Sequence, residues 1–244
     1  MYRTINYILL ILLATACKTT HIPVDDPPAH IHTNPNGQGL ALEIEMIRGP
    51  GHNHPLMAIW VEDTTGGFIQ TLYVANSIGT GCFLHGDNSE GFWKSCEVRR
   101  PAALPRWGHQ RGIRAKDGLF LPDSQNPVAD AYTGPTPQSS FILHTRLDEK
   151  VEGPIRLFFE INQTWDWNEY WTNNKYPDNE EYKTSCQPAL VYALEIDSSG
   201  PKAAGDMKLI GRSHHSGENG ELYTDLHTMT AQKIVKRISV RLSD

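Results

Sequence analysis

The feature that most constrains the fold is a series of short apolar segments, several of which alternate with polar residues. In residues 40–47, apolar side chains occupy every second position, and Glu43 and Glu45 stand between them. Successive side chains of a β-strand point to opposite faces, so this pattern predicts a half-buried strand. Seven more segments are rich in Val, Ile, Leu, Phe and Tyr, and are also predicted to be strands. They are residues 56–62, 68–74, 141–147, 155–162, 189–197, 207–212 and 234–242.

With about eight predicted strands and no long amphipathic helix, we expect an all-β fold. The preferred architecture is an immunoglobulin-like antiparallel β-sandwich, with a barrel as the alternative. Gly66 and Gly67 predict a tight hairpin between the second and third segments. Regular patterning fades over residues 76–137, an insertion too long for an idle loop. We expect it to be functional or to form its own small layer, with one short helix or turn at residues 93–98.

The N-terminus has the layout of a secretory signal. Arg3 precedes an apolar run over residues 8–14, and the small residues Thr15 and Ala16 precede Cys17. The run is shorter than the roughly 20 residues that span a bilayer. The segment ending at Cys17 resembles the lipobox of bacterial lipoproteins, whose cysteine is acylated. The alternative is a plain signal peptide with an incidental cysteine.

The predicted domain organisation follows from this leader. Residues 1–16 are a lipoprotein signal peptide, residues 17–39 a flexible tether rich in Pro, Asp and Gly, and residues 40–244 one β-sandwich domain. Sorting rules for the residue after the cysteine, here Lys18, favour the outer membrane. We therefore expect a lipid-anchored protein of the cell envelope, facing the periplasm or the surface. The net charge of −6 is spread along the chain, which argues against a nucleic-acid partner.

Three cysteines remain after Cys17, and an oxidising envelope permits a disulfide between two of them. Cys82 and Cys96 enclose a short Gly- and Asp-containing loop and are one candidate pair. Pairing of either residue with Cys186, or three reduced thiols, is equally allowed by the sequence.

One segment of the insertion, residues 130–136, resembles the attachment motif of exported FMN-binding domains. That resemblance implies covalent FMN on Thr136, with Asp130, Thr133 and Gly134 as recognition residues. Pro135 departs from the motif, because proline fixes the backbone where the motif has alanine. The alternative is an ordinary Thr-Gly-Pro turn before the next strand.

A wider stretch resembles an uncharacterised exported family, domain-of-unknown-function family 2271. The resemblance is carried by a strand with Trp60, Glu62 and Asp63, a turn at Gly66, and the following Thr71 and Leu72. The blocks RRPAALPRWGHQRG, DAYTGPTP and QPALVYALEID extend it over most of residues 40–242. It implies an exported protein without an assigned reaction, from a group of which some members occur beside flavin-transfer systems.

Clustered histidines are candidate ligands for a divalent metal. Two His-x-His pairs, in which both rings share one face of an extended strand, and one His-His pair occur among eleven histidines. His30 and His32 fall in the predicted tether. The preferred candidates are His52, His54, His214 and His215. The alternative is a set of exposed loop histidines with hydrogen-bonding roles.

Residues 160–171 combine three tryptophans with carboxylates and amides. Oxygen ligands at this density suit calcium, and aromatics beside carboxylates suit a carbohydrate cleft. The favoured alternative is an aromatic cluster that caps the sandwich.

Three functions follow. The preferred one is a non-catalytic binding or accessory lipoprotein that binds an envelope protein or small ligand through the insertion and the tryptophan-rich loop. The others are a redox accessory protein with covalent FMN and a metal-dependent enzyme. No hydrolase elbow or nucleotide loop occurs in the sequence, so we lean against catalysis.

Overall fold

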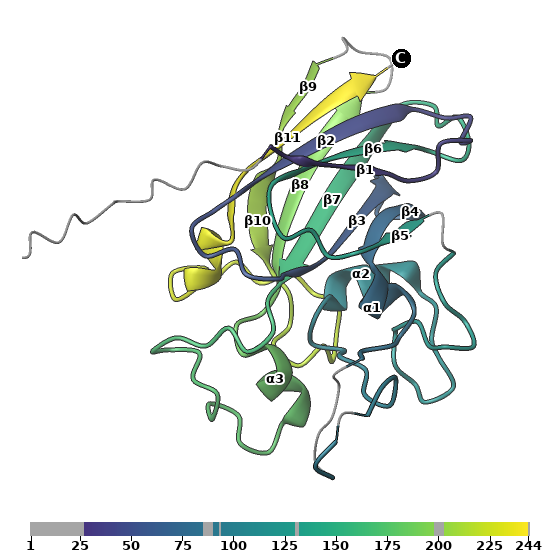
Figure 1. Cartoon of the computed structure of the whole chain (residues 1–244). Coiled ribbons are helices and arrows are strands. Elements are labelled where there is room, and N and C mark those ends of the chain that lie inside the picture. The colour runs from purple at the N-terminus through teal and green to yellow at the C-terminus, as the bar shows by residue number, and fades with distance from the viewer. Residues whose placement is uncertain (1–26, 85–89, 93, 130–131, 198–202, 244) are drawn as a thin grey trace, which may run out of the picture.

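The computed structural model describes residues 27–84, 90–92, 94–129, 132–197 and 203–243. Two β-sheets form a sandwich (Figure 1), which confirms the predicted all-β fold class. The five-stranded sheet has the order β1 (Ala29–His32), β6 (Phe141–Arg146), β2 (Ala41–Arg48), β11 (Val235–Ser243) and β9 (Ala203–Asp206). The six-stranded sheet has the order β10 (Lys208–Arg212), β8 (Leu190–Asp197), β7 (Pro154–Asn162), β3 (Leu56–Asp63), β4 (Phe68–Ala75) and β5 (Thr133–Gly134).

All eight predicted strands are present, and each end lies within one residue of its predicted position. The pairs inside both sheets are antiparallel, whereas the edge pairs β1–β6 and β4–β5 are parallel. The first core lies between the two sheets. Alternate residues of β2 point into it, so that Ile44 is fully buried while Glu43 and Glu45 face outward.

The predicted hairpin joins β3 to β4. Its closing bond runs from the Asp63 N–H to the Gly67 carbonyl at 2.9 Å, and Oδ1 of Asp63 accepts from the N–H of Thr65 at 2.7 Å. Gly66 has a φ of +88°, in the left-handed region where glycine is favoured. The two glycines therefore serve the turn as the sequence predicts.

The other face of the six-stranded sheet is covered by described residues of the segment 76–137 outside β5, which we call the insertion layer. It contains α1 (Asn76–Gly79) and α2 (Pro105–Arg111). Trp107 of α2 is fully buried in a second core with Trp60 and Phe158 of the sheet, and its Nε1 donates to Oγ1 of Thr71 at 3.0 Å. Because both faces of this sheet are covered, β3 is buried at nearly every position.

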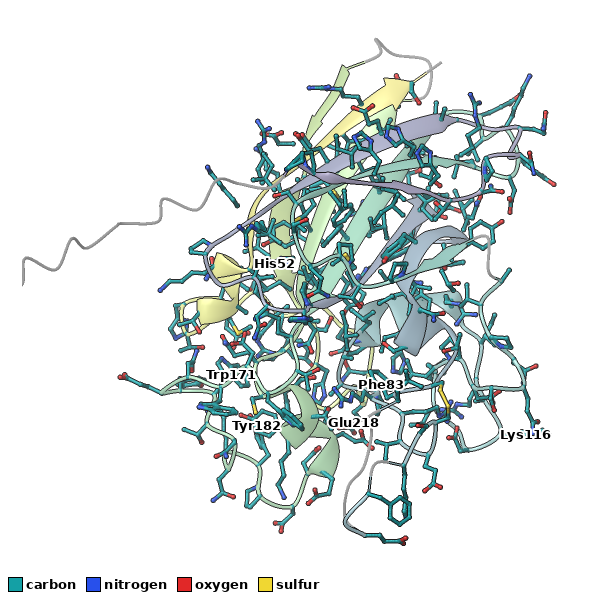
Figure 2. The ribbon with its side chains drawn as sticks, in the orientation of Figure 1. His52, Phe83, Lys116, Trp171, Tyr182 and Glu218 are labelled. Atoms are coloured by element: carbon teal, nitrogen blue, oxygen red, sulfur yellow. A yellow bond between two sulfur atoms is a disulfide. The ribbon has the colours of Figure 1, made fainter. Side chains whose placement is uncertain are left out.

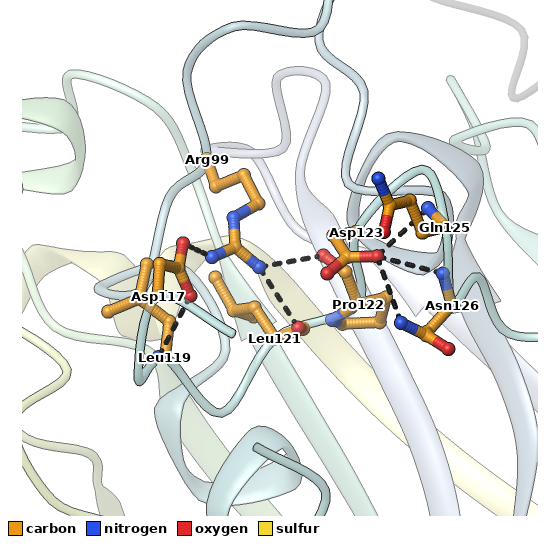
Figure 3. Close-up of polar contacts among 8 residues, drawn as sticks. All are labelled: Arg99, Asp117, Leu119, Leu121, Pro122, Asp123, Gln125 and Asn126. Carbon is orange, nitrogen blue, oxygen red and sulfur yellow. Dashed lines mark hydrogen bonds and ion pairs between the residues drawn. The ribbon is translucent and has the colours of Figure 1, made fainter. Parts of the chain in front are cut away.

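Polar contacts hold the loops of the insertion layer in place (Figure 3). Arg99 pairs with Asp117 and donates to the carbonyls of Leu121 and Pro122 at 3.1 and 3.2 Å. Cys82 and Cys96 form a disulfide, one of the pairings that the sequence left open, and Cys186 is free and buried.

Of the short helix or turn predicted at residues 93–98, the helix is absent from the described residues 94–98. Residues 94–98 contain only an isolated bridge and a bend, and the helix lies at Pro105–Arg111. Pro105 occupies the first turn of α2, where a missing N–H costs nothing. Gly112, with a φ of +67°, ends the helix.

The prediction of a flexible tether up to residue 39 is wrong from residue 29 onward. β1 adds to the edge of β6 by parallel pairing, and the following residues are fixed by side-chain bonds. Oγ1 of Thr33 donates to the Leu72 carbonyl at 2.8 Å, and Nδ2 of Asn34 donates to the Arg146 carbonyl at 2.8 Å. A free strand edge supplies backbone partners, so a segment with few apolar side chains is ordered without a core of its own.

Candidate functional site: an aromatic loop at the end of the sandwich

The connection between β7 and β8 is long and exposes several aromatic side chains. Residues 163–187, called the aromatic loop below, contain α3 (Glu180–Ser185) and extend from one end of the sandwich (Figure 1). Trp165, Trp167 and Tyr170 are 57%, 60% and 49% exposed. Large aromatic side chains normally bury most of their surface, so three such residues on one loop mark a surface for contact.

The backbone at Trp165 is held in an uncommon conformation. Its φ is +55°, a region that bulky residues rarely adopt. The Trp165 N–H donates to the Thr184 carbonyl at 3.1 Å, and the Asp166 N–H donates to the Ser185 carbonyl at 3.0 Å. These bonds to α3 maintain the conformation, and strained positions of this kind concentrate at functional sites.

Asn168 and Gln187 fasten the next turn of the aromatic loop. Oδ1 of Asn168 accepts from the N–H groups of Tyr170 and Trp171 at 2.9 and 2.7 Å, and its Nδ2 donates to Oε1 of Gln187 at 3.1 Å. Gln187 is buried, and its Oε1 also accepts from the Ala231 N–H at 3.0 Å. An amide pair satisfied on every side fixes the loop against the segment before β11.

Buried aromatics form the inner wall of the same loop. Tyr182 belongs to α3, and Trp171 lies near it in the same loop (Figure 2). Nε1 of Trp171 donates to Oγ1 of Thr228 at 3.0 Å, and the Tyr182 hydroxyl donates to the Thr172 carbonyl at 2.6 Å. The loop therefore has a packed inner side, so its exposed side chains project from an ordered support.

The charge around the exposed rings is mainly negative. Residues 163–187 hold five carboxylates and two lysines. Nζ of Lys175 lies 3.5 Å from the centre of the Tyr170 ring and donates to the Tyr170 carbonyl at 3.3 Å, so it occupies one face of that ring. Within the described chain, the indoles of Trp165 and Trp167 make no hydrogen bond, ring contact or cation contact. Their flat faces are available to a ligand.

Two of the oxygen ligands expected near these tryptophans, Glu160 and Asn162, are committed to partners inside the fold. Glu160 is fully buried under α2, where its carboxylate accepts from the N–H of Trp107 at 2.8 Å, the N–H of Arg106 and the hydroxyl of Ser213. Burial raises the pKa of Glu160 to about 7. Asn162 instead donates to the Gln187 carbonyl at 2.9 Å. Both side chains have structural roles inside the fold.

The preferred histidine set is also divided between separate surroundings. Nε2 of His52 donates to the Pro137 carbonyl at 3.2 Å, and exposed His54 bonds its neighbour Asn53. His214 and His215 pack together with ring centres 4.3 Å apart, and burial lowers the pKa of His215 to about 4. Among the described residues, no group of three or more His, Cys, Asp or Glu side chains is placed to hold a metal ion.

His215 stacks on the aromatic wall, with its ring centre 4.0 Å from that of Tyr176. Its low pKa keeps the ring neutral in this packing at neutral pH.

The flavin-like segment is part of a sheet edge. Thr133 and Gly134 pair with β4, and a side chain at position 134 would collide with the ring of Tyr73. The Tyr73 hydroxyl donates to the Pro135 carbonyl at 2.7 Å. The glycine of the motif thus has a packing role, while Thr136 is half-buried and Asp130 lies outside the described residues.

The comparisons with known proteins leave the resemblances as predictions. Protein-family models, curated proteins and solved structures give no match to this chain. Within the part of the chain that the structure describes, no helix has the length and apolar character needed to cross a membrane.

Proposed function

We propose that this chain is a lipid-anchored domain of the bacterial cell envelope that binds carbohydrate without catalysis, through the aromatic loop. The observation that carries the proposal is the pair of exposed indoles, Trp165 and Trp167, on a hydrogen-bonded support. The anchor at Cys17 rests on the signal and lipobox pattern of residues 1–17.

The chemistry of the two indoles suits a sugar ring. An aromatic face carries partial negative charge, and the C–H groups on one face of a pyranose carry partial positive charge. A flat contact between them buries apolar area, while the sugar hydroxyls turn toward polar neighbours such as Asp166 and Glu169. Preorganised indoles lose little conformational freedom on binding, which favours affinity.

The surrounding charge argues for a neutral or cationic glycan rather than an anionic membrane surface. The carboxylates of the aromatic loop outnumber its lysines, and a surface that binds anionic lipid is instead rich in lysine and arginine. Loss of one aromatic platform residue commonly lowers affinity by about tenfold or more.

The test is binding of the purified domain to purified peptidoglycan sacculi by co-sedimentation, and to N-acetylglucosamine oligosaccharides by calorimetry. We expect binding by the wild type and a loss of about tenfold in affinity for Trp165→Ala and for Trp167→Ala. Phe92→Ala is the matched control, since Phe92 is an equally exposed aromatic at 60% in the insertion layer.

Wild-type protein that binds neither sacculi nor oligosaccharides would contradict the proposal. Equal binding by the wild type and the Trp165→Ala, Trp167→Ala double variant would do so as well, because it would place any glycan contact elsewhere.

A further inference from the structure

A small pocket opens where α2 meets the loop that follows β10. It is lined in part by the block of residues 99–112, which the proposed carbohydrate site does not use. Its volume is about 110 Å³. One water molecule needs roughly 10–15 Å³, and pockets for drug-sized ligands measure roughly 300–1,000 Å³. The pocket therefore suits a small ligand with few heavy atoms.

The lining combines apolar walls with a few polar side chains. Prolines, leucines and the ring of Phe120 form most of the walls. The polar side chains among the described lining residues are His109, Arg114 and Glu218. An apolar pocket with a few polar groups of different character is the usual form of a small-molecule site.

Two glycines allow the backbone segments around the pocket to approach closely. A side chain at Gly108 of α2 would collide with the Phe120 carbonyl, and one at Gly217 would collide with the Pro101 carbonyl. Gly217 also has a φ of +78°, in the left-handed region that favours glycine. The pocket is therefore a feature of the backbone arrangement and does not depend on the rotamer of one exposed side chain.

Polar contacts fix the loop after α2, which forms one wall of the pocket (Figure 3). Arg99 donates to the Leu121 carbonyl at 3.1 Å, and it pairs with Asp117. Oδ1 of Asp117 accepts from the Leu119 N–H at 3.1 Å. Asp117 is thus committed to Arg99 and does not neutralise the nearby Arg114.

Arg114 supplies a positive charge whose donors are unused. Its guanidinium lies over the Phe120 ring, 4.8 Å from the ring centre. This stacking positions the guanidinium without using its N–H groups. Among the described residues, Arg114 makes no hydrogen bond or ion pair. Its donors are therefore available to an acceptor on a ligand.

Glu218 supplies a negative charge that is also unpaired. In the part of the chain that the structure describes, its carboxylate makes no hydrogen bond or salt bridge, including with Arg114. Burial lowers the pKa of the neighbouring His214, and the charge of Glu218 opposes that shift. His214 is therefore mainly neutral at neutral pH and does not balance the carboxylate.

His109 adds an acceptor to the same pocket. Its ring packs against Phe120 with centres 4.3 Å apart, and its Nε2 lies 3.1 Å from the Gly217 carbonyl oxygen. A carbonyl oxygen only accepts, so Nε2 carries the proton, and in the neutral ring Nδ1 is an acceptor. Within the described chain, Nδ1 has no hydrogen-bond partner.

The remaining cations of α2 have partners elsewhere. Arg106 donates to the Gly220 carbonyl at 3.0 Å, and the guanidinium of Arg111 lies 4.8 Å from the centre of the Trp107 ring. The pocket thus offers one unpaired donor group and unpaired acceptors, on opposite sides of an apolar space.

We propose that this pocket binds a small free α-amino acid. The carboxylate of such a ligand accepts from the guanidinium fork of Arg114, and its ammonium donates to Glu218 and to Nδ1 of His109. A zwitterion satisfies both charges of the pocket with a single short molecule. The volume limits the side chain to that of glycine, alanine or serine. The site is independent of carbohydrate binding at the aromatic loop.

The test is calorimetric titration of the folded domain with glycine and with L-alanine at about pH 7, where a carboxyl group is ionised and an amino group is protonated. Acetate and methylamine, each of which carries one of the two charges, are the matched probes. We expect saturable binding of both amino acids. Acetate, methylamine and the bulky L-tryptophan should bind at least about tenfold more weakly than glycine.

Variants of the two charged residues locate the binding. Arg114→Gln and Glu218→Gln should each lower the affinity for glycine by about tenfold, because each removes one charge-assisted contact. Both side chains are exposed, so their replacement leaves the core intact. Lys116→Gln and Glu221→Gln are the controls, since these exposed charges of the same two loops do not line the pocket. They should leave the affinity unchanged.

Absence of saturable binding of glycine and alanine would overturn the proposal. Acetate or methylamine that binds as tightly as glycine would do so as well, because one charge would then suffice. Equal affinity in Arg114→Gln, Glu218→Gln and the wild type would place the amino acid elsewhere on the molecule and would also contradict the proposal.

Discussion

At the scale of single residues, Glu160 links three parts of the fold. Leu104, at the N-cap of α2, supplies no side-chain acceptor, so the first N–H groups of the helix need an acceptor from elsewhere. The Glu160 carboxylate, which comes from β7, accepts two of them, and it also accepts from Ser213 after β10. A buried acid thus performs the capping that a local Ser or Asp usually provides.

The raised pKa of Glu160 predicts a pH dependence of stability. Its pKa is about 7 in the folded state and near 4.5 when unfolded, so the unfolded chain releases this proton first as the pH rises. The contribution to the free energy of unfolding is full below about pH 4.5 and is lost toward pH 7, by about 3 kcal/mol at most.

Denaturant titrations at a series of pH values measure this dependence. We expect Glu160→Gln to flatten the decline in unfolding free energy between about pH 4.5 and 7. Glu195→Gln, at an exposed position of β8, should retain the wild-type slope. A Glu160→Gln protein with an unchanged slope would show that this carboxyl does not titrate with folding.

At the scale of elements, the insertion layer is part of the cooperative core. Trp107 fills the space over the six-stranded sheet and is fully buried. We expect Trp107→Ala to lower the free energy of unfolding by about 3–5 kcal/mol, because truncation of a buried aromatic loses transfer free energy and leaves a cavity.

Ile113→Ala serves as the control for this change, since Ile113 follows the same helix and is 55% exposed. Its effect should stay within about 0.5 kcal/mol. If Trp107→Ala unfolds at the wild-type denaturant concentration, the insertion layer contributes no stability to the sandwich.

The elements also show which sequence signals were sufficient to predict the positions of strands and helices. Strands with a continuous or alternating apolar pattern were predicted to within a residue, because periodicity depends on local sequence. β1 and α2 were missed, because each is stabilised by distant partners: the edge of β6 for β1, and Glu160 for α2. Such partners leave no signature within the segment itself.

The candidate sites also divide into features that the local sequence predicts and features that depend on distant partners. The tryptophans of the aromatic loop were recognised from composition, and Asn168 carries a local sign, an Asn that accepts from the N–H groups of the next turn. Gln187 lies beyond a further helix, so its role as the partner of Asn168 required the three-dimensional structure. The stacking of His32 of β1 on His144 of β6 required the parallel register of these strands, which no periodicity encodes.

At the scale of the whole molecule, the proposed anchor is open to direct test. Expressed in a bacterial host fed a radiolabelled fatty acid, the chain should incorporate label and fractionate with the outer membrane. Cys17→Ala should remain unlabelled, because the sulfur of Cys17 is the atom that carries the lipid. Cys186→Ala should label normally. A wild-type product without label, or one that retains Met1 in the cytosol, would contradict the lipoprotein proposal.

Because β1 pairs with β6, a force applied to the N-terminal segment acts first on that pairing. Any pull on the segment before residue 27 reaches four backbone pairs between β1 and β6, and then the side-chain bonds of Thr33 and Asn34. The central strand β2 lies beyond these contacts. Under tension from the proposed anchor, the β1–β6 pairing therefore separates first, and the core between the two sheets stays intact.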